Sequence, residues 1–63
     1  MLFVKLTSVY DGNPIYVNAA NIMTVEPYSD GCTVINMTGN AYTKVKESAE
    51  AVIDLIFDDD DLR

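Results

Sequence analysis

The sequence contains no histidine and no tryptophan, and its only cysteine is Cys32. Without histidine, the Ser-His-Asp and Cys-His pairings that activate a nucleophile are excluded. A single cysteine excludes an intrachain disulfide and leaves too few ligands for zinc. We therefore expect a protein that is not an enzyme, that binds no metal and no cofactor, and that resides in the reducing cytoplasm.

Positive charge and long apolar runs are also scarce. Four Lys and Arg residues oppose ten Asp and Glu residues, which gives a net charge of −6. Because affinity for phosphates is built from Lys and Arg, direct nucleic-acid binding is not expected. No segment approaches the ~18 apolar residues of a membrane span, and the short apolar start does not have the pattern of a signal peptide. The sequence therefore predicts no membrane insertion.

The chain is short and rich in apolar residues. At 63 residues it can bury only about 60% of its unfolded surface, which limits it to one small core without a deep pocket. Yet 49% of its residues are hydrophobic, so part of this surface must stay exposed or be covered by another chain. This composition favours a homo-oligomer or a protein partner. A third option is an oligomer that sequesters a small ligand between its subunits.

Most of the chain has the pattern of short strands. Apolar residues alternate with polar ones near the N-terminus, and clusters of Gly, Pro, Asn and Asp separate β-branched and aromatic segments. The predicted strands are 2–7, 15–17, 22–26, 32–37 and 41–45, with a short turn or one helical turn at 18–21. Because tight turns cannot join parallel strands, we expect an antiparallel meander of about five strands that can curl into a small barrel.

The periodicity changes near the C-terminus from that of a strand to that of a helix. One apolar face is formed by Ala49, Val52, Ile53, Ile56 and Phe57. Ser48 is the expected N-cap, and the helix should fray by about residue 58, where a run of Asp begins. The sequence thus predicts an α+β fold with one C-terminal helix, as a single domain over residues 1–57 with an acidic tail at 58–63.

Negative charge is concentrated in this helix and its tail. Residues 1–46 are neutral overall, whereas residues 47–63 carry seven acidic residues against Arg63. The candidate acidic face, which spans an arc of roughly 80° on the helix and continues into the tail, comprises Glu47, Glu50, Asp54, Asp58, Asp59, Asp60 and Asp61. It is either a solvated surface or a contact for a partner with a basic surface. The second option includes a phage-type inhibitor, of the anti-defence or anti-CRISPR kind, that blocks the basic groove of a nucleic-acid enzyme.

Aromatic residues form a second candidate surface. In an alternating strand Tyr16 points away from its apolar neighbours, and tyrosine exposed on a sheet is enriched at interfaces. The residues proposed for an oligomer or partner surface are Phe3, Tyr16, Tyr28 and Tyr42. The first strand is the expected edge for pairing with another chain, and core packing is the alternative role for any one tyrosine.

The order of these motifs resembles a known family. The segments concerned are Val4-Lys5-Leu6-Thr7, Asp11-Gly12, Pro14-Ile15-Tyr16-Val17-Asn18, Ile22 with Val25-Glu26, Thr33-Val34-Ile35 with Gly39, and Val45-Lys46-Glu47-Ser48 with Glu50 and Val52-Ile53. Together they look like the small FlbD/SwrD-like flagellar proteins, over nearly the whole chain up to Phe57. This resemblance implies a cytoplasmic, non-enzymatic accessory protein of flagellar motility. The family has no known catalytic residues that could be assigned to positions of this sequence. Domains of this appearance also occur in phages, so a phage context, with the host cytoplasm as location, stays open.

Overall fold

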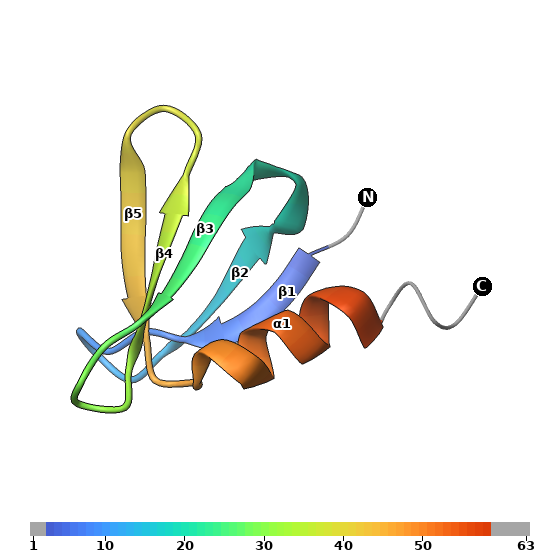
Figure 1. Cartoon of the computed structure of the whole chain (residues 1–63). Helices are drawn as coiled ribbons and strands as arrows, with labels where there is room; N and C mark the ends of the chain where they lie inside the picture. The colour runs from blue at the N-terminus through green and yellow to red at the C-terminus, as the bar shows by residue number, and fades with distance from the viewer. Residues whose placement is uncertain (1–2, 59–63) are drawn as a thin grey trace.

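A computed structural model describes residues 3–58 of the chain (Figure 1). The elements are β1 (Phe3–Thr7), β2 (Pro14–Asn18), the 3-10 helix η1 (Ala19–Asn21), β3 (Ile22–Pro27), β4 (Thr33–Met37), β5 (Ala41–Val45) and α1 (Ala49–Asp58). Every strand pairing among the described residues is antiparallel. The predicted α+β class is therefore confirmed, with strand limits within two residues of those expected.

The strands form two sheets rather than one. Strands β1 and β2 make a hairpin, and β3, β4 and β5 make a three-stranded meander. Between them the 3-10 helix η1 turns the chain, with the Asn18 side chain accepting a hydrogen bond from the Ala20 N–H at 3.0 Å. Two backbone hydrogen bonds join the sheets at one corner, from Val9 to the Lys44 carbonyl at 3.0 Å and from Lys46 to the Thr7 carbonyl at 2.9 Å. The strands thus wrap around a common interior.

Both sheets and the helix contribute to one core. The buried residues are Val4, Leu6, Val17, Ile35, Val45 and Val52. Along β1 the alternation predicted from the sequence is observed, because Val4 and Leu6 point inward while Phe3 and Lys5 are exposed. The helix contacts β1 of one sheet and β3 of the other, and it runs beside β1 (Figure 1).

Helix α1 buries a narrower face than its apolar pattern predicts. Val52 is fully buried and Ile56 packs against the core, but Ile53 and Phe57 are 37% and 57% exposed. The expectation that Ile53 and Phe57 also face the sheet is therefore wrong. The arc of apolar residues around the helix is wider than its contact with the core, since Leu55, on the other flank of Val52, is also 41% exposed.

The end of the helix falls where the run of Asp begins. Asp58 is the last residue of α1, in agreement with the expected end, and residues 59–63 lie outside the described part of the chain. No helix among the described residues is long and apolar enough to span a membrane.

Candidate functional site

A hydrogen-bonded junction fixes the helix to the sheets. The Glu47 carboxylate accepts two hydrogen bonds from Thr7, at 3.0 Å from its backbone N–H and at 2.9 Å from its hydroxyl. The Thr33 hydroxyl donates to the Glu47 carbonyl at 2.7 Å, and Thr33 is fully buried. The Glu47 junction, formed by Thr7, Thr33, Glu47 and Ser48, thus ties the end of β1 and the start of β4 to the loop before α1.

Ser48 completes this junction as the helix N-cap, as expected. Its hydroxyl oxygen accepts the Ala51 N–H at 3.1 Å, and its carbonyl accepts the Val52 N–H at 2.9 Å. An N-cap side chain satisfies one of the N–H groups that the first turn leaves unpaired. The helix therefore starts at a fixed point and in a fixed direction relative to β1.

The electrostatics of Glu47 fit a structural role. Partial burial acts to raise its pKa, but the hydrogen bonds from the Thr7 N–H and hydroxyl outweigh this and leave the pKa of Glu47 below its ordinary value. The carboxylate is held ionised and directed toward β1. Glu47 precedes the helix, so it does not share the arc of Glu50 and Asp54 that helical spacing implied.

The acidic face within the described residues comprises Glu50 and Asp54. Both are exposed, and they lie one helical turn apart. Neither forms an ion pair within residues 3–58, and the last turn of α1 contains no basic residue. The side chain of Asp58 and residues Asp59 to Asp61, which the sequence added to this face, lie outside what the structure describes.

An exposed apolar stripe runs beside these carboxylates. The half-buried Ala49 and the exposed Ile53 and Phe57 are spaced by four residues, which places them on one side of α1; they are called the outer stripe below. A shallow depression of the surface is lined by Ala49, Glu50, Ile53 and Asp54. Apolar and acidic side chains therefore share one continuous surface of the helix, away from the buried Val52.

The four aromatic residues predicted to form a surface are exposed, but they fall on two different sheets. Phe3 and Tyr16 lie on the outer face of the β1–β2 hairpin, in register positions that are diagonal to each other. Tyr42 is on β5, and Tyr28 is in the turn after β3. The structure thus brings together one pair on the hairpin and places the other two on the three-stranded sheet.

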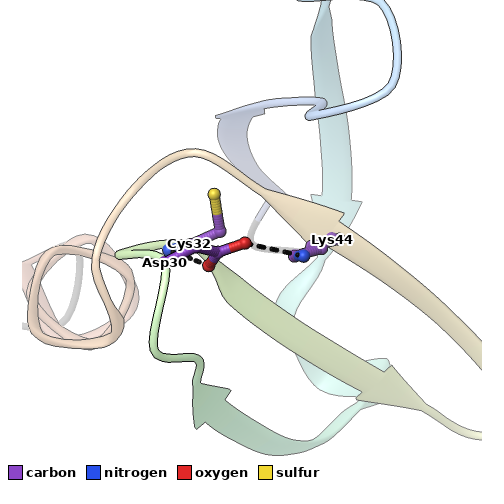
Figure 2. Close-up of polar contacts among 3 residues, drawn as sticks. All are labelled: Asp30, Cys32 and Lys44. Carbon is purple, nitrogen blue, oxygen red and sulfur yellow. Dashed lines mark hydrogen bonds and ion pairs between the residues drawn. The ribbon is translucent and has the colours of Figure 1, made fainter.

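Tyr28 belongs to a small polar cluster over β4 and β5. The Lys44 ammonium lies 3.0 Å from the Asp30 carboxylate and 5.1 Å from the centroid of the Tyr28 ring. Figure 2 shows Asp30 between the backbone of Cys32 and Lys44. The Cys32 N–H and the Lys44 ammonium both donate to the Asp30 carboxylate and lower its pKa, and this contact raises the pKa of Lys44. The cluster orders the β3–β4 turn, and the thiol of Cys32 points away from it.

Comparison with known proteins assigns the chain to a family. The model of the FlbD family, described as flagellar and swarming motility proteins, matches residues 3–61. The chain belongs to the FlbD family. No curated protein and no solved structure gives a significant match. This FlbD protein is accordingly a small protein associated with flagellar or swarming motility, and the match runs four residues past Phe57, into the acidic tail.

The motifs that carry this family resemblance meet in space. The segment ending at Thr7, the segment starting at Thr33 and the segment containing Glu47 and Ser48 converge at the Glu47 junction. Sequence reasoning assigned Glu47 to the acidic face and gave Thr7 and Thr33 no role. The available signal was a hydroxyl residue at the end of one strand and another at the start of a second, but local periodicity cannot connect them to Glu47, which lies 40 residues from Thr7 and 14 from Thr33.

Proposed function

We propose that this FlbD protein is a protein-binding module of the motility apparatus, and that it performs no chemistry. The observation that carries the proposal is the exposure of Ile53 and Phe57 on a helix that already covers the core with Val52 and Ile56. Apolar side chains exposed together on one helix face are typical of a docking surface. A partner protein that covers this surface explains why the helix keeps two apolar faces.

The ionisable groups support binding rather than catalysis. In the part of the chain that the structure describes, the carboxylates whose pKa is displaced are Asp30 and Glu47, and hydrogen bonds that hold them ionised displace both downward. A carboxyl acting as general acid near neutral pH needs a raised pKa, as burial in apolar surroundings provides. Cys32 is a free thiol, which fits a reducing cytoplasmic location.

Self-association is a further part of the proposal, and its support lies in β1. This strand pairs with β2 along its length, whereas backbone pairing on its other edge, among the described residues, is limited to Thr7, Ser8 and Val9, which meet Lys44 to Lys46. Unpaired strand edges invite a second chain. We expect light scattering to give the mass of a dimer at micromolar concentration, and a monomer there would remove this part of the proposal.

Motility of a deletion strain tests the main proposal. Deleting the gene should impair swarming, and the wild-type chain should restore it. A variant with Ile53→Gln and Phe57→Gln should fail to restore it, because it keeps good helix formers but loses the apolar stripe. The matched control is Met23→Gln, which changes a side chain that is 67% exposed on β3 and should restore swarming. Full restoration by the double variant would refute binding through this surface.

A further inference from the structure

The acidic residues beside the outer stripe of α1 indicate the charge of a protein that would bind there. Glu50 and Asp54 border the stripe, and together with Ala49 and Ile53 they line one shallow depression. A partner side chain that packs against Ile53 therefore lies within reach of two carboxylates. Since these carboxylates form no ion pair within residues 3–58, their charge is available to a partner.

The acidic residues are also unfavourable for the isolated helix. Like charges one turn apart repel each other, and negative charge near a helix C-terminus opposes the helix dipole. Helix α1 has this arrangement, with Asp54 and Asp58 toward its C-terminus and no basic residue in its last turn. Positive charge from a partner removes both penalties, so this helix is electrostatically suited to a basic surface.

We propose that the outer stripe, with Glu50 and Asp54, docks a basic amphipathic helix of a partner protein. This rests on the proposed binding function and names the chemical class of the partner. Apolar residues on one side of the partner helix pack against Ile53 and Phe57, and Lys or Arg residues beside them pair with the two carboxylates. Ten residues of α1 span about 15 Å, enough for three turns of the partner.

A second copy of this chain is a poor occupant of the same surface. In a two-fold symmetric contact the same patch lies on both sides, so Glu50 and Asp54 of both chains would enter one interface, and α1 offers no basic residue to pair with them. The net charge of −6 adds to this repulsion. Charge complementarity therefore favours a basic partner over self-association at α1, and leaves the edge of β1 as the surface proposed for the dimer.

Binding of synthetic peptides to the full chain tests this partner class. The probe is a fluorescent amphipathic helix of Leu and Lys, compared with a peptide in which Glu replaces each Lys and with a scrambled Leu/Lys peptide that has no apolar face. Fluorescence anisotropy should show tighter binding of the amphipathic Leu/Lys peptide than of either comparison peptide, weakening with added salt. Equal affinity for the scrambled peptide would mean attraction by charge alone and would overturn the proposal.

Variants locate the binding on the helix. The double variant Ile53→Gln and Phe57→Gln should weaken binding of the Leu/Lys peptide at least about tenfold, whereas Met23→Gln should leave it unchanged. Replacing Glu50 and Asp54 by Lys should reverse the preference toward the Leu/Glu peptide. Circular dichroism confirms that each variant is folded, and binding that none of these α1 changes affects would contradict the proposal.

The two proposals fail in different ways. If Ile53→Gln and Phe57→Gln abolish swarming while the Leu/Lys peptide does not bind, the docking surface stands and the partner is not a basic helix. If the peptide binds as expected but the double variant swarms normally, the charge preference is real and the proposed function of this surface is wrong.

Discussion

At the scale of single residues, Glu47 connects parts of the chain that are far apart in sequence. Its carboxylate receives both hydrogen bonds that Thr7 offers, and its carbonyl receives the bond from the buried Thr33. Hydrogen bonds to an ionised group are stronger than those between neutral groups. We therefore assign Glu47 to stability rather than to partner binding.

The substitution Glu47→Gln tests this assignment. The amide nitrogen of Gln cannot accept a hydrogen bond from Thr7, so the free energy of unfolding at neutral pH should fall by about 1–2 kcal/mol in urea denaturation. The control Asp54→Asn changes an exposed side chain of α1 and should alter stability by less than about 0.5 kcal/mol. Equal midpoints for Glu47→Gln and the wild type would contradict the role.

The same residue predicts a dependence on pH. The pKa of folded Glu47 lies below its ordinary value of 4.5, so the unfolded chain takes up a proton first as the pH falls. The stabilisation by Glu47 is therefore complete above that value and is lost as the pH falls through the folded pKa. The difference in free energy of unfolding between wild type and Glu47→Gln should shrink over this pH range. A difference that stays constant down to the lowest pH at which the protein folds would show that ionisation of Glu47 does not stabilise the fold.

Gly39 is a second position at which one physical property, the backbone conformation, determines the residue. Its φ of 81° lies in the left-handed region, and the added Cβ of an alanine would meet nothing within 4 Å. Gly39→Ala should thus cost about 1–2 kcal/mol from backbone strain alone, without a steric clash. Asn40, with a φ of 62°, provides the control, since Asn40→Gly should stay within about 0.5 kcal/mol of wild type in the same urea titration.

At the scale of elements, helix α1 has an inner and an outer apolar face. Val52 and Ile53 are neighbours in the sequence, yet the first is fully buried and the second is 37% exposed. The Glu47 junction and the Ser48 cap determine where the helix starts and so which edge of its apolar arc reaches the core.

Alanine substitutions at these two neighbours measure the orientation of the helix. Val52→Ala removes two buried methyl groups and should cost about 2 kcal/mol of unfolding free energy. Ile53→Ala should cost less, about 1 kcal/mol, because its side chain is 37% exposed and alanine improves helix propensity. Comparable losses at both positions would mean that the helix packs as its apolar pattern alone suggests.

The elements themselves were predictable from the sequence, because each has a local cause. Alternation in β1, turn residues between the strands and the apolar period of α1 predicted all five strands and the helix. The separation into two sheets and the hydrogen bonds that Thr7 donates to Glu47 were not predictable, since both depend on contacts between residues about 40 positions apart. The rotation of α1 follows from those contacts, so the exposure of Ile53 and Phe57 could not be read from periodicity.

At the scale of the whole molecule, charge and apolar surface are distributed differently. The two sheets and the inner face of α1 build the core, whereas most of the net negative charge belongs to α1 and the residues that follow it. This separation allows the acidic part of the chain to change without disturbing the fold, and it predicts that binding and stability respond to different substitutions.

Neutralising the tail tests that separation. Replacing Asp58 to Asp61 by Asn removes four of the ten acidic residues. The variant should unfold at a midpoint no lower than that of the wild type, and it should bind the Leu/Lys peptide more weakly, with a smaller dependence on salt. Anisotropy titrations at low and high salt measure the change. An unaltered salt dependence would mean that the tail does not attract the peptide and that only Glu50 and Asp54 contribute charge to its binding.

The central claim is that the inner face of α1 holds the fold while its outer stripe serves motility. It is tested most directly by the swarm expansion rate of a strain whose only copy carries Ile53→Gln and Phe57→Gln, at the wild-type level of folded protein. Expansion should be as slow as that of the deletion strain. Expansion at the wild-type rate would contradict it.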